Sequence, residues 1–170
     1  MNMATEHLNA SPLTQLLQRQ RSSYLAAPNP NYATRVEQLT RLKAAILQFK
    51  TPLVEALSQD YGHRSIDDSL ISDIMPVINN INYSLKNLKK WLKPSARHAG
   101  LLLAPAKVTV HYQPLGVIGI IVPWNFPVML SIGPLVTAIA AGNHAMLKLS
   151  EFTPATNQVI KQLLAHVFDE

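Results

Sequence analysis

Two polar residues, Asn125 and Lys148, each stand just past an apolar run of this 170-residue sequence. The amide of asparagine is a good donor to an oxyanion, because it is neutral and does not compete with a base for protons. A loop at the end of a strand, here the segment Pro-Trp-Asn-Phe-Pro, can fix such a side chain in place. The alternative is that Asn125 caps a helix that starts at Pro127, or forms an Asx turn. The first interpretation predicts a site at which a carbonyl group reacts.

The residues around this candidate site predict a strand, a helix and a second strand, in that order. None of the residues from 113 to 146 is charged. The predicted segments are a strand at 117–122, a loop at 123–127, a helix at 128–141 that stops at Gly142-Asn143, and a strand at 145–147. Ligands of parallel sheets bind beyond the carboxyl ends of the strands. Asn125 and Lys148 should therefore face one crevice.

The first part of the chain predicts helices that carry no catalytic constellation. Apolar residues recur every three or four positions, and Ser11 with Pro12 is a helix start. The expected helices begin at Ser11, span 32–49, run from Thr51 to Gly62 and span 65–92, where Pro76 should kink or divide the last one. Three acids, Asp67, Asp68 and Asp73, are interpreted as first-turn acids that complement the dipole of the helix opened by Ser65. Residues 1–10 are predicted to be a disordered tail.

Residues 96–114 predict a β-hairpin arm. The run Leu101–Leu103 is followed by Ala-Pro-Ala, and apolar and polar residues then alternate from 108 to 113. This pattern favours two strands with one apolar face. An isolated hairpin is barely stable in water, so the apolar face should pack against something else. A further helix is expected at 153–168.

Composition and charge exclude several kinds of site. The net charge of +5 comes with a row of basic residues, which we interpret as a solvated helix face because no nucleic-acid-binding motif accompanies it. These residues are Lys86, Lys89, Lys90, Lys93 and Arg97. The chain has no cysteine, which excludes a disulfide, a cysteine-ligated metal and a thiol nucleophile among its own residues. The six scattered histidines favour no metal site.

The long uncharged stretch does not predict a membrane-spanning helix, although its length alone would allow one. Prolines interrupt it, at 114, 123, 127 and 134. The first twelve residues also lack the apolar core of a secretory signal. These features predict a cytoplasmic protein that binds neither membrane nor nucleic acid.

The segment Pro-Trp-Asn-Phe-Pro, followed after a helix by Lys-Leu-Ser-Glu, resembles the aldehyde dehydrogenase superfamily. The resemblance runs from about Leu13 to the end of the chain, and its nearest branch oxidises hydrophobic and aromatic aldehydes such as coniferyl aldehyde. It implies a truncated aldehyde dehydrogenase fold of the α/β class. The implied parts are helices of the cofactor domain at 11–95, an oligomerisation hairpin at 96–114 and the first βαβ unit of a Rossmann-like parallel sheet, which is incomplete, at 115–170.

The resemblance also implies roles for the residues at the strand ends. Asn125 matches the family's oxyanion donor, which acts with the backbone N–H of a catalytic cysteine. The residues implied in cofactor binding are Val122, Pro123 and Trp124 on the nicotinamide side, Lys148 and Glu151 at the adenosine ribose, and Ser150 between these two. The carboxylate of Glu151 favours NAD, with NADP possible. Leu149 departs from the family, which usually has proline there.

Simpler alternatives stay open for the two charged residues. Lys148 can be a surface lysine at a strand end. Glu151 can be a charge near the N-terminus of the helix that follows Thr153.

The catalytic residues of the family that are absent from these 170 residues determine what the chain is expected to do. In the family, the cysteine nucleophile and the general-base glutamate lie beyond the position of Glu170, so the 170-residue chain alone is expected to be inactive. The complete enzyme would be a homo-oligomer that oxidises an aldehyde to the acid through a cysteine thioester. The alternatives are an acylating or semialdehyde dehydrogenase on the same scaffold, and a non-catalytic helical interaction module.

Overall fold

A computed structural model describes residues 11–168 of the chain, so the predicted tail at 1–10 lies outside the described residues. The helices are α1 (Pro12–Ala26), α2 (Tyr32–Gln48), α3 (Lys50–Asp60), α4 (Ile66–Ser69), the π-helical turn η1 (Leu70–Ile74), α5 (Met75–Trp91), the 3-10 turn η2 (Leu101–Leu103), α6 (Pro127–Ala141) and α7 (Pro154–Val167). The strands are β1 (Ser95–Arg97), β2 (Val108–Val110), β3 (Val117–Ile121) and β4 (His144–Lys148). Most of the expected elements are therefore present within a few residues of their predicted ends.

The predicted strand–helix–strand unit is confirmed. Strands β3 and β4 pair in parallel, with Val117 opposite His144 and Ile121 opposite Lys148. Helix α6 connects them and ends at Gly142, whose φ of 84° lies in the left-handed region that glycine adopts without strain. Because the strands are parallel, their carboxyl ends meet at one edge of the sheet, where the loop after β3 and the turn after β4 both begin.

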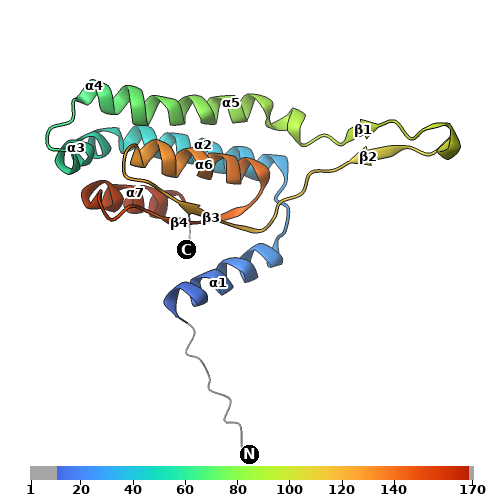
Figure 1. The fold of residues 1–170 in the computed structure, drawn as a ribbon, viewed down its shortest axis with the longest axis horizontal. Helices are drawn as coiled ribbons and strands as arrows, with labels where there is room; N and C mark the ends of the chain where they lie inside the picture. Colours follow the sequence, from blue (N-terminus) through green and yellow to red (C-terminus); the bar gives the residue numbers. More distant parts are fainter. Residues whose placement is uncertain (1–10, 169–170) are drawn as a thin grey trace, which may run out of the picture.

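Helix α6 is the most buried element of the fold. It packs against α2 and α5 on one side and against β3 and β4 on the other, and α7 packs on α2 and α3 (Figure 1). Apolar side chains from all these helices form one core, among them Leu39, Leu42, Ile81, Ile132, Val136 and Ile160. Helix α1 has no buried residue and lies on the opposite side of the two-stranded sheet from this core (Figure 1). It contacts the sheet through Tyr24, whose ring meets that of His144 edge to face.

The predicted helix at 65–92 begins as expected and is divided before Pro76. Ser65 caps it, with its Oγ accepting from the N–H of Asp68 at 3.0 Å. Proline cannot donate to the carbonyl of Ser72 four residues earlier, and its ring would crowd that carbonyl. The π-helical turn η1 ends at Ile74, two residues before this proline, so the regular helix is interrupted where the Ser72 carbonyl loses its usual donor. The turn also faces Asp73 into the molecule, where it is fully buried.

The hairpin exists, but the prediction of its first strand at Leu101–Leu103 was wrong. Residues 95–97 pair antiparallel with 108–110, and the three leucines form a 3-10 turn at the tip of a projecting arm (Figure 1). Leu101 and Leu102 are almost fully exposed. The hydrophobic pattern was misleading because the leucines at the tip of this arm are exposed, so burial does not select which of the arm's residues pair.

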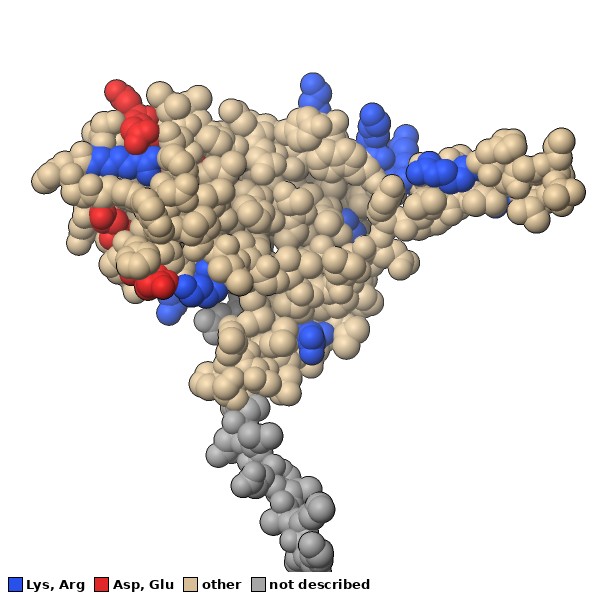
Figure 2. All heavy atoms as spheres, in the orientation of Figure 1, with Lys and Arg blue, Asp and Glu red and all other residues tan. Residues whose placement is uncertain are grey.

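Charged side chains are distributed unevenly over the surface. Figure 2 shows only Lys and Arg over the C-terminal end of α5 and the arm, whereas Asp and Glu lie together with Lys and Arg near the opposite end of the helices. Lys86, Lys89 and Lys90 on α5 are all exposed, as expected for a solvated helix face.

A buried arginine holds the C-terminal end of α6. Arg35 of α2 donates to the carbonyl of Ala140 at 2.9 Å, and also to the carbonyl of Pro30 and to Asn29 Oδ1. A cation at this position matches the partial negative charge of a helix C-terminus. Gly142 is in contact with this guanidinium, since a Cβ built on it would lie 2.6 Å from Arg35 Nη2.

We predict that Gly142→Ala lowers the free energy of unfolding by about 2–4 kcal/mol, because it adds left-handed strain and displaces a guanidinium held by three hydrogen bonds. Gly62→Ala is the matched control, because Gly62 also has a positive φ, of 63°, but nothing lies within 4 Å of its Cβ position. It should cost only the backbone strain, about 1–2 kcal/mol. Urea unfolding followed by circular dichroism measures both. Equal losses of unfolding free energy in the two variants would show that the Arg35 guanidinium can move away from the methyl group that Gly142→Ala adds without destabilising the fold.

Candidate functional site

Asn125 lies in the loop between β3 and α6, exposed and beyond the carboxyl end of the strand. Its side chain makes no hydrogen bond within residues 11–168. The alternative that it caps α6 is wrong, because the N-cap residue is Phe126 and no local side chain caps this helix. The amide is therefore available to a ligand.

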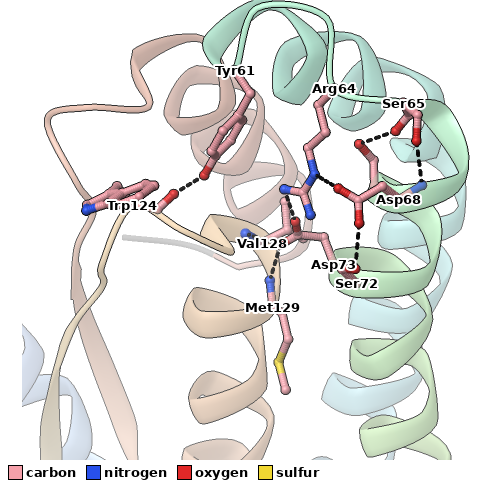
Figure 3. Close-up of polar contacts among 10 residues, drawn as sticks. Tyr61, Arg64, Ser65, Asp68, Ser72, Asp73, Trp124, Val128 and Met129 are labelled. Atoms are coloured by element: carbon pink, nitrogen blue, oxygen red, sulfur yellow. Dashed lines mark hydrogen bonds and ion pairs between the residues drawn. The ribbon is translucent and has the colours of Figure 1, made fainter.

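The buried carboxylate of Asp73 takes the place of a local cap for α6. Its Oδ1 accepts from the backbone N–H groups of Val128 at 3.0 Å and Met129 at 2.9 Å (Figure 3). Burial raises the pKa of Asp73, while these two N–H groups and the guanidinium of Arg64 act to lower it. The interpretation of Asp73 as a first-turn acid of its own helix was wrong, since it complements the N-terminus of another helix, 55 residues away in sequence.

Arg64 connects this carboxylate to its surroundings. It donates to Asp73 Oδ2 at 2.9 Å through Nη1 and to Asp68 Oδ2 at 2.6 Å through Nε, and only 7% of its side chain is exposed (Figure 3). Its guanidinium carbon lies 5.2 Å from the ring centres of both Tyr61 and Phe126, a cation–π distance. Asp68 is half exposed, and the hydrogen bond from Arg64 lowers its pKa.

A shallow hollow opens beside Asn125. Its walls include Tyr61 and Arg64 from the end of α3 and the following turn, and Trp124 and Phe126 from the loop. The hydroxyl of Tyr61 donates to the carbonyl of Trp124 (Figure 3). Gly62, His63 and Asp68 complete the lining, so the hollow combines three aromatic side chains with one amide, one guanidinium and one carboxylate.

Lys148 and Glu151 form a second group at the same edge of the sheet. Lys148 Nζ lies 2.6 Å from Glu151 Oε2, and the two side chains are 62% and 69% exposed. The hydrogen bond from Lys148 lowers the pKa of Glu151. The alternative that Glu151 serves the N-terminus of α7 is not supported, because Asp60 accepts from the N–H groups of Ala155 and Thr156 there, at 3.0 and 2.8 Å.

The other residues expected at the cofactor differ in accessibility. Val122 is buried and donates its N–H to the carbonyl of Lys148, so it extends the parallel pairing by one residue. Pro123 and Trp124 are exposed at the edge. Ser150 is buried, and its Oγ accepts from the N–H of Phe152 within the turn after β4. Their contact with a cofactor stays a prediction.

Lys148 and Glu151 together present the kinds of polar group that bind a pair of sugar hydroxyls. Lys148 brings three N–H donors and Glu151 two carboxylate acceptors, and both are accessible and in contact with each other. Two adjacent hydroxyls need this combination of donor and acceptor.

Residues 11–168 contain no group of three His, Asp or Glu side chains that could hold a metal ion. None of the helices in this range is long and apolar enough to cross a membrane.

Sequence reasoning missed Tyr61 and Arg64, and it assigned Asp73 to the wrong helix. Tyr61 and Asp73 bond to backbone groups 55 to 63 residues away, and the ring of Phe126 near Arg64 is equally distant in sequence, so no local sequence pattern could predict these contacts. One signal was present in the sequence: the helix after Pro127 has no Ser, Thr, Asp or Asn at its N-cap, so an acceptor for its first N–H groups had to come from elsewhere.

Comparison with known proteins shows that the sequence is similar to aldehyde dehydrogenases over nearly its whole length. The sequence profile of the aldehyde dehydrogenase family matches residues 9–168. A probable coniferyl aldehyde dehydrogenase of Pseudomonas aeruginosa is 49% identical over 158 residues, which are 93% of this chain and 33% of that protein. A coniferyl aldehyde dehydrogenase of a Pseudomonas species is 37% identical over 163 residues, which are 96% of this chain and 34% of that protein. The chain spans about a third of the length of these relatives.

Solved structures share the fold. The substrate-bound AldH of Staphylococcus aureus superimposes with a TM-score of 0.89 at 32% identity, over 92% of this chain and 34% of that one. PnpE in complex with nicotinamide adenine dinucleotide superimposes with a TM-score of 0.78 at 26% identity, over 95% of this chain and 32% of that one. The expected α/β fold is thereby confirmed.

We predict that Asp73→Ala lowers the free energy of unfolding by about 3–5 kcal/mol, because it leaves the Arg64 charge and two N–H groups buried without this partner. Asp68→Ala removes the other carboxylate on the same arginine, but that carboxylate is solvated, so little change is expected. Urea unfolding of the two variants makes the comparison. Similar losses for both would mean that Asp73 does not hold the start of α6.

Proposed function

This chain belongs to the aldehyde dehydrogenase family, and we propose that it forms part of an enzyme that oxidises an aldehyde to the carboxylic acid with NAD. The observation that carries the proposal is the side-chain amide of Asn125, which is exposed, makes no hydrogen bond within residues 11–168 and borders an aromatic hollow. A preorganised neutral donor of this kind stabilises the negative charge that develops on a carbonyl oxygen under nucleophilic attack.

Asn125 would do its work by binding the oxygen of the aldehyde. Attack by a nucleophile turns this oxygen into an oxyanion. The amide N–H of Asn125 therefore donates a stronger hydrogen bond to this oxygen in the transition state than in the ground state. The nucleophile must come from outside the 170 residues, since these contain no cysteine. The chain alone is therefore expected to be inactive, and the complete enzyme, of the length of the relatives, is the form to assay.

Lys148 and Glu151 would hold the adenosine ribose of the cofactor, with Val122, Pro123 and Trp124 nearer its nicotinamide. When bound, NAD accepts the hydride that leaves the aldehyde carbon. The carboxylate of Glu151 would accept from the ribose hydroxyls and repel a 2′-phosphate, so NAD is favoured and NADP is the second choice. The accessible ion pair between Lys148 and Glu151 supports this role.

A hydrophobic or aromatic aldehyde such as coniferyl aldehyde is the proposed substrate class. The names of the relatives at 49% and 37% identity support it, and so do the rings of Tyr61, Trp124 and Phe126 around the hollow. The complete enzyme is proposed to be a cytoplasmic homo-oligomer that uses the arm at 95–110. The exposed leucines at the tip of this arm support such a contact.

We predict that Asn125→Ala in the complete enzyme lowers turnover about 100- to 1000-fold, because one oxyanion donor is lost. Affinity for NAD should change little. Steady-state NADH formation measures turnover, and calorimetric titration measures NAD affinity. Asn79→Ala, an exposed asparagine on α5, is the control and should behave as wild type. Turnover of Asn125→Ala within a factor of three of wild type would remove the oxyanion assignment.

Glu151→Gln in the complete enzyme should weaken NAD binding and reduce the preference for NAD over NADP, because the neutral amide no longer repels a 2′-phosphate. Titration with both cofactors measures the two dissociation constants. Glu55→Gln on the exposed side of α3 makes the same charge change away from the site. If both dissociation constants stay at the wild-type values, Glu151 does not contact the ribose.

A further inference from the structure

The side chain of Asn125 depends on its backbone for its position. It makes no hydrogen bond of its own within residues 11–168, and it is exposed. An oxyanion donor must nevertheless be held to within about 0.5 Å of its working position. Whatever fixes the loop on either side of Asn125 therefore determines where its amide points.

Contacts from one short segment, 61–73, hold the loop on both sides of Asn125. Before it, the carbonyl of Trp124 accepts from the hydroxyl of Tyr61. After it, the N–H groups of Val128 and Met129 donate to Asp73. Figure 3 shows these contacts reaching the loop and the start of α6 from the same side of the molecule. The backbone at Asn125 is thus fixed from both directions.

Arg64 joins these contacts into one unit. Its guanidinium carbon lies 5.2 Å from the ring centres of both Tyr61 and Phe126, and the guanidinium donates to Asp73 at 2.9 Å. Its Nη2 is buried and has no hydrogen-bond partner among the described residues. A buried ion pair of this kind contributes little net stability, because desolvation offsets the attraction. It does fix geometry, since each group is held by two or more partners.

We infer that Tyr61, Arg64 and Asp73 are positioning residues that place Asn125 for its reaction. The inference rests on the proposed oxyanion role of Asn125. Tyr61 is the best of the three to mutate, because it bonds to Trp124, the residue next to Asn125, and does not accept from the first N–H groups of α6 or α7. Loss of its hydroxyl frees the Trp124 carbonyl and leaves the ring on Arg64 in place.

The test is Tyr61→Phe in the complete enzyme. A misplacement of about 1 Å costs up to about 100-fold in rate, and loss of one of several restraints should cost about 10-fold in kcat, with the Michaelis constant for NAD unchanged. Tyr83→Phe, on the exposed face of α5, is the matched control and should retain wild-type kcat. Thermal unfolding of both variants should show the same midpoint within a few degrees.

A double-mutant cycle separates positioning from stability. When Asn125 is already alanine, no amide remains to be misplaced, so Tyr61→Phe should then change kcat less than twofold. An undiminished tenfold loss in the Asn125→Ala background would overturn the inference, because Tyr61 would then act without Asn125. Arg64→Lys is the second variant, since it keeps the charge and loses the planar group that contacts both rings, and it should show the same dependence on Asn125.

The cycle also distinguishes the two proposals. If Asn125→Ala is strongly impaired and Tyr61→Phe has wild-type kcat, the positioning inference is wrong and the oxyanion role stands. If Asn125→Ala keeps wild-type turnover, the oxyanion role is wrong and the inference falls with it.

Discussion

The site depends on one buried carboxylate at the start of α6. This helix begins with Phe126 and Pro127, so neither an N-cap oxygen nor the first N–H is available locally. Asp73 accepts from the next two N–H groups and is itself held by Arg64. The loop around Asn125 thus provides no acceptor for the first N–H groups of α6, and Asp73 from another element supplies it. The loop and the helical part of the chain are for this reason a single structural unit.

The same solution recurs at the next helix. Helix α7 also starts with proline, and Asp60 from the end of α3 accepts from its N–H groups. At the other end of α6, the cation Arg35 donates to Ala140. Helix α6 therefore has a carboxylate at its positive end and a guanidinium at its negative end, as its dipole favours. The N-terminal helices do more than cover the sheet, because they supply the charges that set where both later helices begin.

Local patterns in the sequence were sufficient for most elements and insufficient for the contacts between them. The caps at Ser11 and Ser65 and the stop at Gly142 follow from residues within a few positions of each other, and the parallel pairing of β3 with β4 follows from the order of strand, helix and strand along the chain. The partner of Asp73 does not, because its choice depends on how α5 and α6 pack. The prediction of the arm failed for a different reason. An apolar run such as Leu101–Leu103 predicts a strand only where burial holds it in a sheet, and these leucines are exposed. Asn125 and Lys148 were placed at one sheet edge from sequence, whereas the residues that hold the loop were found only in three dimensions.

The most direct test is a crystal structure of the complete enzyme with NAD and an aromatic inhibitor that forms a tetrahedral adduct resembling the attacked aldehyde. The distance to measure joins Asn125 Nδ2 to the oxygen of the adduct that takes the place of the oxyanion. If Asn125 is the oxyanion donor, this distance should be about 2.7–3.1 Å, with Asp73 still bonded to Val128 and Met129. An adduct oxygen more than about 4 Å from Nδ2, or an Asn125 side chain turned into a bond with its own loop, would contradict the account.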